Sequence, residues 1–259
     1  MNNKHIRTTT GMPNILIAPD FPPEHFGGWN IFNAILQRHS ENQIHLLIPH
    51  SAEEQQEMFK KHQVDIIYAN PFDAAYLIRD QSYLPVVKPV KNPDEMVIAT
   101  GASSGIKKIV DLKAGMKIAI TNNHDVKLIG LRLLEAANLN EKDLTWVEVP
   151  SFQAAARAAI KGEVDAAFFV ASSFHSLSEL TKNQMTILIE SHIRDITHVI
   201  LMHPSRKEFV PIIQKTIIDM KNHDAGKKVL NELNMPDGFE ELTVEDAEFM
   251  IDLMETLLD

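Results

Sequence analysis

The sequence predicts an α/β protein built as two lobes with a ligand cleft between them. Apolar runs typical of strands alternate with segments of helical spacing along most of the 259 residues. The alternation is clearest between residues 116 and 169, which read strand, helix, strand, helix, strand. The chain leaves its first α/β stretch near residues 96–101 and returns near 190–197. Two crossing segments of this kind are typical of a hinge, and clefts between lobes commonly hold small ligands.

The stretch 116–169 predicts a parallel sheet with crossover helices. Residues 116–120, 144–149 and 164–169 are the strands, and residues 126–137 carry apolar side chains at helical spacing. An alanine-rich helix after Ser151 should end at Gly162. Such βαβ units are right-handed, and they bind ligands at the carboxyl ends of the strands. These ends carry residues 121–125, 151–153 and 170–173.

The elements before this stretch form the first part of lobe one. We expect strands at 14–18, 44–48, 64–68, 84–90 and 96–100, and helices at 29–38, 51–62 and 70–78. Residues 19–28 form a loop rich in proline, glycine and aromatic residues. Ser51 should cap the second helix, with Glu54 completing a capping box. Asn70 precedes a proline at the first helical position, which suits a helix start.

The remaining elements complete lobe two and return to lobe one. We expect a helix at 172–180, a strand at 186–189, a polar connection at 190–195 and a strand at 196–202. Helices follow at 211–222, 225–233 and 244–258. Lobe one therefore comprises residues 1–98 and 195–259, and lobe two comprises residues 99–194.

Composition excludes several classes of protein. A formal charge of −10 argues against a nucleic-acid partner, because neutralising phosphates needs a basic face. No run approaches the length of a membrane span. The first residues show no apolar region of a signal peptide, so we expect either a cytoplasmic protein or a trimmed secreted form. The absence of cysteine excludes disulfides, thiolate catalysis and cysteine metal sites.

The sequence contains patterns that resemble catalytic and metal-binding motifs, but their context does not fit either function. The run G-A-S-S-G at 101–105 matches a hydrolase nucleophile elbow, but the lysine-rich segment after it is too short for the buried helix that an elbow needs. Among the twelve histidines, His45 and His50, or His192 and His198, lack the spacing of metal ligands. We therefore expect no enzyme activity, no metal and no cofactor.

Residues at the predicted carboxyl ends of strands are the candidate ligand contacts. Aromatic side chains in the first βα loop commonly wall a pocket, although a packed loop, a core tyrosine and a helix cap are the alternative interpretations. Arg194 would supply a fixed cation for an acidic group. The candidates are Phe26, Trp29, Tyr68, Asn70, Phe72, Asn123, His124, Asp125, Ser151, Phe152, His175, His192 and Arg194.

Several runs together resemble one family. Residues 64–72 (V-D-I-I-Y-A-N-P-F), 104–106, 110–119, 161–167 (K-G-E-V-D-A-A) and 224–230 are similar to the phosphate/phosphite/phosphonate-type (PhnD-like) substrate-binding proteins of ABC transporters. The resemblance runs from about residue 14 to the end of the chain. It implies a type II periplasmic-binding-protein fold, a periplasmic location and capture of a small polar ligand for an ABC transporter permease, without catalysis. A monomer is expected.

Three positions depart from the family pattern. Asn123-His124-Asp125 stands where the family often has a Ser-Thr-Ser-type run, Phe152 replaces a histidine, and no acid follows the strand that ends near Val170. A carboxylate at a helix start repels an incoming anion. We therefore expect phosphate and simple phosphonates to bind poorly, with His124 and Asp125 either a selectivity filter or merely a helix start. A ligand-sensing module that reports to a signalling protein is the alternative function.

Overall fold

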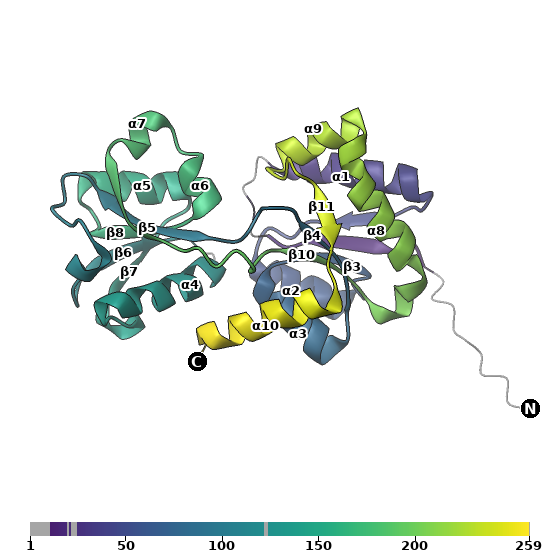
Figure 1. The fold of residues 1–259 in the computed structure, drawn as a ribbon, viewed down its shortest axis with the longest axis horizontal. Helices are drawn as coiled ribbons and strands as arrows, with labels where there is room; N and C mark the ends of the chain where they lie inside the picture. Colours follow the sequence, from purple (N-terminus) through teal and green to yellow (C-terminus); the bar gives the residue numbers. More distant parts are fainter. Residues whose placement is uncertain (1–10, 20, 22–24, 122–123, 259) are drawn as a thin grey trace, which may run out of the picture. The chain divides into compact units, whose positions relative to one another are not determined.

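A computed structural model describes residues 11–19, 21, 25–121 and 124–258, and it describes the side chains of all of these except 124, 125, 257 and 258. The chain divides into two compact units. The first unit comprises Met1–Asn92 and Thr197–Ile251, and the second comprises Pro93–Ile196 and Asp252–Asp259. Each unit is an α/β sandwich with its own sheet (Figure 1).

The first unit contains a six-stranded sheet in the order β11-β4-β10-β3-β1-β2. Strands β1 to β4 run in one direction, whereas β10 and β11 are antiparallel to their neighbours. The strands are β1 (Asn14–Ile17), β2 (His45–Leu47), β3 (Ile66–Ala69), β4 (Leu84–Pro89), β10 (Val199–Met202) and β11 (Phe239–Glu241). The helices are α1 (Phe26–Ser40), α2 (Ala52–Lys61), α3 (Pro71–Gln81), η5 (Pro204–Phe209), α8 (Val210–Asp219), η6 (Met220–Asn222), α9 (Asp224–Glu232) and α10 (Val244–Leu258).

The core of the first unit follows from alternation along the central strands. Ile15 and Ile17 of β1 point into the apolar cluster formed with α1, α8 and α9, while Leu16 between them is equally buried on the other face. Figure 1 shows α1, α8 and α9 on one side of the sheet and α2 and α3 on the other. Strands covered on both faces explain why the sequence reads as continuous apolar runs rather than alternating ones.

The second unit contains a five-stranded sheet in the order β7-β6-β8-β5-β9. Its strands are β5 (Met96–Gly101), β6 (Lys117–Ile120), β7 (Thr145–Glu148), β8 (Ala166–Val170) and β9 (Met185–Glu190). Its helices are η2 (Ile109–Asp111), α4 (His124–Leu134), η3 (Glu135–Ala137), η4 (Glu141–Asp143), α5 (Phe152–Lys161), α6 (Ala171–His175) and α7 (Glu179–Lys182). In this sheet β5 is antiparallel to β8 and β9, whereas β6 is parallel to β7 and β8.

Two apolar clusters cover the two faces of this second sheet. Ile98 of β5 and Phe168 of β8 belong to the cluster under α4, whereas Val97 and Phe169 belong to the cluster under α5. Helix α4 approaches closely because Gly130 has no side chain, and a Cβ there would lie 2.1 Å from the ring of Phe168. The alternation of strand residues between two helical layers is therefore complete in both units.

The two sheets share one strand order. Without its edge strand β11, the first sheet has the order β2-β1-β3-β10-β4, and the second has the order β7-β6-β8-β5-β9. The fourth strand of each order, β10 or β5, is antiparallel to both of its neighbours. In each unit this strand directly follows a crossing segment, since β5 comes after Asn92 and β10 comes after Ile196. The parallel sheet that the sequence predicts for residues 116–169 is confirmed, since β6 is parallel to β7 and to β8. The antiparallel direction of β5 and β10 was not predicted. Their apolar runs could not reveal direction, because a strand buried on both faces reads the same either way.

In each unit an aspartate directly precedes the strand in third place of the order given above, β3 in the first unit and β8 in the second. The carboxylate of Asp65 accepts a hydrogen bond from the backbone N–H of Asn14 at 3.1 Å, and that of Asp165 accepts one from Lys117 at 2.7 Å. Each aspartate thereby ties its strand to the start of the neighbouring parallel strand. The similar Val-Asp pairs at 64–65 and 164–165 thus have the same structural role.

Three predicted elements differ in the structure. Helix α1 begins at Phe26 rather than at residue 29, even though Gly27 and Gly28 disfavour a helix. Gly28 is instead required by packing, since a Cβ there would lie 2.7 Å from the side chain of Leu233. The predicted helix 172–180 is two short helices, α6 and α7. The Ser178 hydroxyl is the N-cap of α7, because it accepts the N–H of Thr181. Strand β11 was not predicted.

The predicted capping box is half present. The Ser51 hydroxyl accepts the N–H of Glu54 at 3.2 Å, whereas the Glu54 carboxylate accepts the N–H of His50 at 2.7 Å rather than that of Ser51. Among the residues that the structure describes, no helix has both the length and the apolar character needed to cross a membrane.

Candidate functional site

In an open α/β sheet the ligand-binding edge lies where neighbouring strands lead to helices on opposite sides. In the first unit this point lies between β1 and β3, and in the second between β6 and β8. The residues that follow these strands are Ala18 and Asn70 in the first unit, and Thr121 and Ala171 in the second. These two edges are the candidate functional surfaces, and each is described within its own unit.

Aromatic side chains gather at the edge of the first unit. Trp29 lies at 4.7 Å from Tyr68 and at 6.1 Å from Phe21, measured between ring centroids. Phe21 also packs edge-on against Phe26 at 5.2 Å. The ring of Tyr68 stacks on that of His198 at 5.2 Å. The structure therefore brings together three of the predicted aromatic candidates, Phe26, Trp29 and Tyr68.

Trp29 is the least satisfied polar residue of this cluster. Its side chain is only 1% exposed, yet its indole Nε1 has no hydrogen-bond partner among the described residues. Trp29 is the fourth residue of α1, and helical side chains lean toward the helix N-terminus. That first turn contains no acidic residue, and the His25 side chain does not cap it. A buried N–H donor therefore belongs to the first turn of a helix, where the backbone N–H groups have no partners within the helix itself.

Asn70 and Phe72 lie at the start of α3. The Asn70 side-chain oxygen accepts the N–H of Asp73 at 2.8 Å, and its amide donates to the Asp73 carboxylate at 3.2 Å. Asn70 is thus the N-cap of α3, as the alternative interpretation has it. Phe72 is partly buried in the first turn of that helix. A role of either residue in ligand contact stays a prediction.

The edge of the second unit carries the ends of β6 and β7. The Oγ1 atom of Thr121 is buried and has no partner among the described residues. Ser151 caps α5 by accepting the N–H of Ala154 at 3.2 Å, and Phe152 packs on Phe169 at 6.0 Å. Asn123 lies outside the described residues. His124 and Asp125 open α4, but their side chains lie outside the description.

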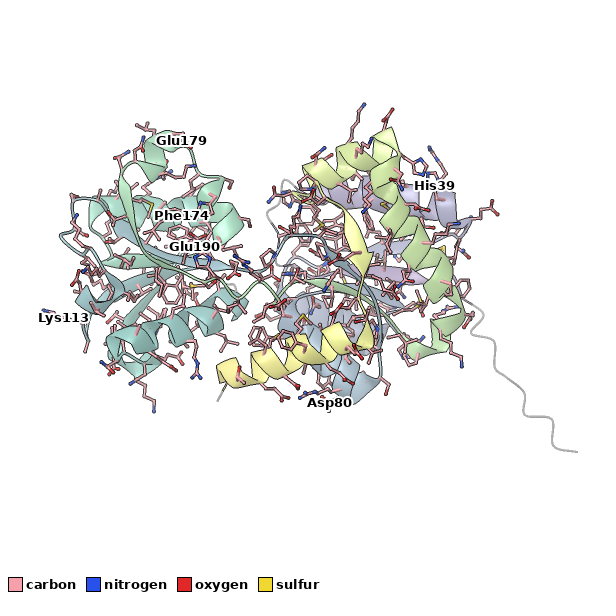
Figure 2. All side chains as sticks on the ribbon, viewed as in Figure 1. His39, Asp80, Lys113, Phe174, Glu179 and Glu190 are labelled. Atoms are coloured by element: carbon pink, nitrogen blue, oxygen red, sulfur yellow. The ribbon has the colours of Figure 1, made fainter. Side chains whose placement is uncertain are left out.

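The antiparallel strand adds acidic residues to the same edge. Met96 pairs with Val170 and Val97 with Glu190, so that Glu95 and Glu190 both lie where β8 ends. The Glu190 carboxylate lies 2.8 Å from Nε2 of His175. His175 also contacts the ring of Phe174, and Figure 2 labels both Phe174 and Glu190. The acid that the family pattern places after β8 is thus absent from the sequence position, but two carboxylates lie at that edge.

The predicted candidates His192 and Arg194 belong to the second crossing segment. Both are exposed, and the guanidinium of Arg194 has no hydrogen-bond or ion-pair partner within the described part of the chain. The backbone N–H of Arg194 donates to Glu95 at 2.6 Å. Sequence reasoning missed Glu95. Its position directly before a buried strand at this edge was the signal that could have found it.

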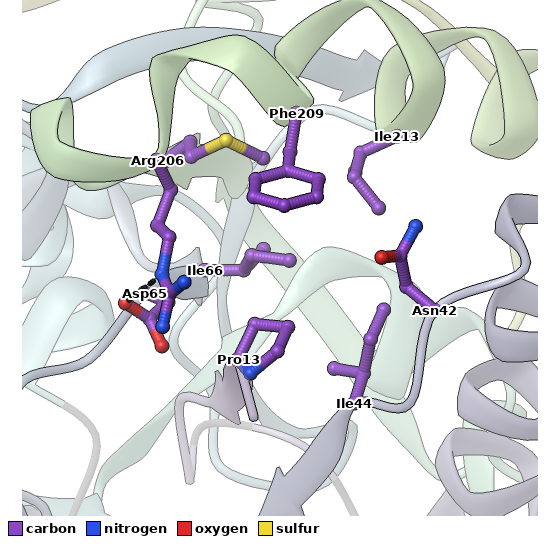
Figure 3. A pocket seen from close by; sticks show the side chains of 9 residues that line it. Pro13, Asn42, Ile44, Asp65, Ile66, Arg206, Phe209 and Ile213 are labelled. Carbon is purple, nitrogen blue, oxygen red and sulfur yellow. Dashed lines mark hydrogen bonds and ion pairs between the residues drawn. The ribbon is translucent and has the colours of Figure 1, made fainter. Parts of the chain in front are cut away.

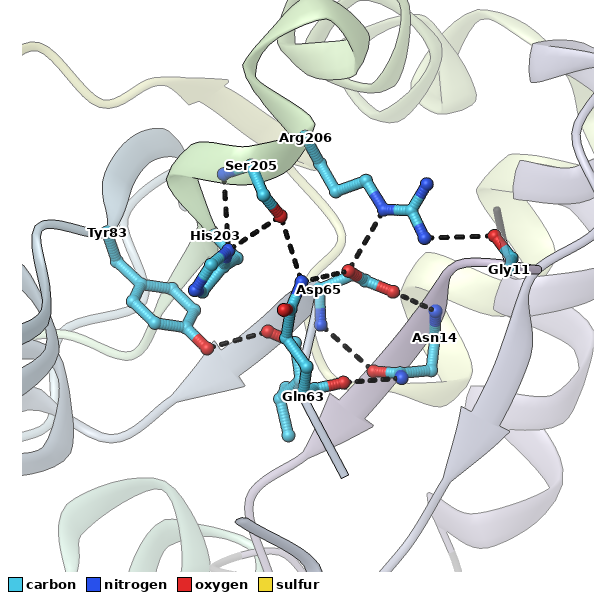
Figure 4. A network of polar contacts seen from close by, with 9 residues as sticks. Gly11, Asn14, Gln63, Asp65, Tyr83, His203, Ser205 and Arg206 are labelled. Atoms are coloured by element: carbon cyan, nitrogen blue, oxygen red, sulfur yellow. Dashed lines mark hydrogen bonds and ion pairs between the residues drawn. The ribbon is translucent and has the colours of Figure 1, made fainter. Parts of the chain in front are cut away.

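A second polar network lies at the opposite edge of the first sheet, away from the candidate surface (Figure 4). Asp65 is 3% exposed and pairs with Nε of Arg206 at 3.0 Å. Arg206 also donates to the carbonyl of Gly11 at 2.9 Å, and Gln63 donates to Asp65 at 3.1 Å. The network ties the start of the described chain to the segment after β10, and sequence reasoning did not anticipate it.

Burial tunes two titratable groups in this network. Burial, and then the charge of Asp65, raise the pKa of the Tyr83 hydroxyl, which donates to the carbonyl of Val64 at 2.6 Å. Burial lowers the pKa of His203 below its ordinary value of 6.5, an effect that Asp65 opposes and Arg206 strengthens. Both shifts are explained by a structural role.

The cavity beside this network is too small for a solute. It is lined by residues including Pro13, Asp65, Arg206 and Phe209, and its volume is about 10 Å³ (Figure 3). That volume corresponds to about one water molecule. Across the described residues, no group of three or more histidine, aspartate or glutamate side chains could hold a metal ion. The first unit therefore holds a structural network here, not a ligand site.

Comparison with known protein families shows to which family the chain belongs. Residues 15–247 match the family described as "ABC transporter, phosphonate, periplasmic substrate-binding protein". The chain belongs to this family of phosphonate-type periplasmic substrate-binding proteins. Proteins of the family are solute-binding components that work with the permease and ATPase of an ABC transporter. A search of curated proteins finds no match.

Solved structures of the family and its neighbours share the fold at low sequence identity. PhnD1 from Prochlorococcus marinus, in complex with methylphosphonate, matches with a TM-score of 0.77 at 10% identity, over 95% of this chain and 97% of that chain. XAC2383 from Xanthomonas citri, bound to chloride ion, matches with a TM-score of 0.77 at 12% identity, over 95% and 98%. The aliphatic sulphonate binding protein SsuA from Escherichia coli matches at 0.67 and 16% identity, over 94% and 91%.

These comparisons confirm two sequence predictions. The resemblance to the phosphonate-type family is confirmed, and the two-lobed type II periplasmic-binding fold is confirmed with it. The role of a solute-binding protein follows from membership of the family. At these identities the solved structures support the fold alone, and the choice of solute depends on the residues of this chain.

Proposed function

We propose that this chain captures a small polar solute with the residues at the two edges described above, and delivers it to an ABC transporter permease. The observation that carries the proposal is Trp29. A buried indole N–H without a partner is costly unless a ligand supplies the acceptor. This N–H lies at the edge where open α/β sheets bind ligands.

The proposed chemistry divides between the two units. The first unit supplies aromatic walls from Phe26, Trp29 and Tyr68, with the Trp29 indole and the start of α1 as hydrogen-bond donors. The second unit supplies Thr121, whose buried hydroxyl has no partner in the described part of the chain, and acidic residues next to β8. Arg194 adds a cation for an acidic group on the solute. Asn70, Phe72, Asn123, His124, Asp125, Ser151, Phe152, His175 and His192 complete the proposed contacts.

The proposed protein is not an enzyme. The hydroxyl of Ser104 in the G-A-S-S-G run accepts the N–H of Ile106 at 3.1 Å and the hydroxyl of Thr100 at 3.0 Å. These contacts make the run a hydrogen-bonded loop after β5, as the sequence predicts. Within the described chain, Ser103 is exposed and forms no hydrogen bond to a histidine, so the run lacks a nucleophile–base pair. A signalling partner in place of the permease is the second candidate function.

Location, assembly and lobe boundaries are part of the proposal. We propose a periplasmic location, which the description of the family supports, and a monomeric state. The lobe boundaries predicted at residues 98 and 194 are proposed as the limits of its moving parts. Cytoplasmic sensing is the corresponding location for the second candidate function.

The proposed solute is not phosphate or a simple phosphonate. Oxyanions need several convergent donors, whereas this edge carries Asp125 at the start of α4 and the carboxylates of Glu95 and Glu190. A carboxylate at a helix start repels an anion that would bind there. The methylphosphonate in PhnD1 is therefore not carried over to this chain.

A thermal-shift screen against small polar metabolites tests the proposal. We expect at least one solute to raise the melting temperature in a concentration-dependent way, because a ligand that binds only the folded state stabilises it. Calorimetry with phosphate, phosphite and 2-aminoethylphosphonate should show weak binding. A submicromolar dissociation constant for any of these three contradicts the proposed selectivity, and a screen without a stabilising solute contradicts solute capture.

A further inference from the structure

Glu95 is the centre of a hydrogen-bonded cluster that joins the two crossing segments within the second unit. Its carboxylate accepts the hydroxyl of Ser191 and, at 2.6 Å, the backbone N–H of Arg194. Its carbonyl accepts the N–H of Ala171 at 2.7 Å, at the start of α6. Ser191 is 3% exposed, and its hydroxyl also accepts the N–H of Met96 at 2.9 Å. The Glu95 side chain thus holds a buried serine and the turn after β9, while its backbone carbonyl binds the residue after β8.

The turn that Glu95 holds is strained. Arg194 has a φ of 62°, in the left-handed region that a residue with a side chain rarely adopts. The N–H of Asp195 donates to the carbonyl of Ile193 at 2.8 Å and closes a three-residue turn around Arg194. With positive φ at its centre, this is the rare form of the γ-turn. Such backbone persists only where surrounding contacts determine it, and Glu95 provides that contact.

The strained turn leaves the guanidinium of Arg194 free of other partners in the described chain. Neighbouring carboxylates do not neutralise it, since that of Glu95 accepts Ser191 and the Arg194 backbone, and Oε1 of Glu190 lies against His175. An exposed arginine on a fixed backbone loses less entropy on binding than one on a mobile loop. Its planar donors match the two oxygens of a carboxylate or phosphonate.

We propose that Glu95 is a positioning residue: it holds the turn 191–195 in the strained conformation that presents Arg194 to the acidic group of a solute. The proposal rests on the proposed function, because it assigns Arg194 a part in that site. It adds a residue that does not itself touch the solute. The acidic group is a carboxylate, and methylphosphonate serves as the comparison anion that should bind poorly.

Nuclear magnetic resonance tests the proposal with acetate and methylphosphonate as probes. The variant is Glu95→Gln, and the matched control is Glu163→Gln, an exposed acid of the same unit whose carboxylate lies 3.7 Å from Lys161. The readouts are the exchange rate of the Arg194 backbone amide and the shift of its Nε–H resonance as each probe is added. If Glu95 only stabilised the fold, the Arg194 Nε–H resonance would titrate in the same way in Glu95→Gln and in the wild type.

In the wild-type chain we expect a protected Arg194 amide and an Nε–H resonance that titrates with acetate and responds less to methylphosphonate. In Glu95→Gln the amide should exchange about tenfold faster or more, and the apparent affinity of the probe should fall by a similar factor. Glu163→Gln should match the wild type. A Glu95→Gln chain with unchanged titration, or a wild-type Nε–H resonance that does not respond to acetate, overturns the proposal.

The Arg194→Ala variant separates this proposal from the proposed function. If a small solute remains bound to both wild type and Arg194→Ala in native mass spectra, solute capture stands and the role of Arg194 fails. If no solute binds to the wild type, the proposed function itself fails. In the Arg194→Ala background, Glu95→Gln should no longer weaken binding, because the two residues act through one contact with the solute.

Discussion

At the scale of single residues, Trp29 is where structure and function are most closely joined. Its aromatic surface belongs to the core of the first unit, while its indole N–H, at the candidate edge, has no partner among the described residues. A buried donor that lacks a partner reduces stability, and a ligand that supplies the acceptor recovers that loss. The same side chain can therefore report on both folding and binding.

Replacing Trp29 by phenylalanine separates these two roles. Trp29→Phe keeps most of the aromatic surface and removes only the indole N–H and part of the ring, so the loss of stability should be small, about 1 kcal/mol. Affinity for the solute should fall by about tenfold or more, equivalent to about 1.4 kcal/mol. Calorimetry with the solute found in the screen measures this loss.

Trp146 provides the matched control for that substitution. Its Nε1 donates to the carbonyl of Glu141 at 3.0 Å, so Trp146→Phe removes a satisfied donor in the second unit. This variant should bind the solute with wild-type affinity. If Trp29→Phe also binds normally, the indole N–H does not meet the solute.

Asp125 distinguishes a selectivity filter from a helix start. Asp125→Asn should keep most of the stability, since asparagine caps nearly as well as aspartate. It should lower the affinity for the solute by about tenfold or more. His124→Ala should cost little stability. Thermal melts and titrations of both variants measure these effects. Wild-type affinity in both would assign the pair a structural role only.

At the scale of elements, the network around Asp65 and Arg206 anchors the first strand. Asp65→Asn would leave the buried Arg206 charge without its counterion, and breaking a buried pair in this way costs about 3–5 kcal/mol. Denaturant titrations measure the loss. The matched Asp165→Asn should cost less, about 1 kcal/mol, because Asp165 binds a backbone N–H without a buried arginine. Equal losses would show that the Arg206 pair adds nothing.

His203 makes the stability of the same network depend on pH. Its pKa is lowered in the folded chain, so the unfolded chain takes up the proton first as the pH falls. His203 should therefore cost stability as the pH falls below its ordinary value of 6.5, and contribute no such loss above it. Melting curves of wild type and His203→Gln should converge at high pH and separate in acid, with the variant the more stable. Parallel curves would contradict this sign.

Most elements were predictable from the sequence because their signals are local. Apolar runs predicted the central strands β1, β3, β6 and β8, and Ser151 and Gly162 predicted the limits of α5. The antiparallel direction of β5 and β10 and the start of α1 were not predictable, because they depend on packing between distant residues. Gly28 against Leu233 is such a contact.

The candidate site was only partly predictable for the same reason. Strand-end position found Trp29 and Tyr68, which the structure brings together. It also proposed Asn70 as a ligand contact, although its side chain is the cap of α3. Glu95 was missed, because its partners Ser191 and Arg194 lie about a hundred positions away in the sequence.

At the scale of the whole molecule, two units with one strand order repeat a single design. Each unit receives its antiparallel strand from a crossing segment and carries an aspartate at the start of its third strand. Each also has one candidate ligand-binding edge, where its central strands end. This repetition and the family match over residues 15–247 both support solute capture as the function of the chain.

Native mass spectrometry of the freshly purified protein tests that claim most directly. We predict a population heavier than the polypeptide by the mass of one small organic molecule, which is released on unfolding and reduced in Trp29→Phe but not in Trp146→Phe. After the molecule is removed, adding it back should restore the heavier population. A spectrum that contains only the bare polypeptide, and that stays unchanged with every solute of the screen, would contradict the account.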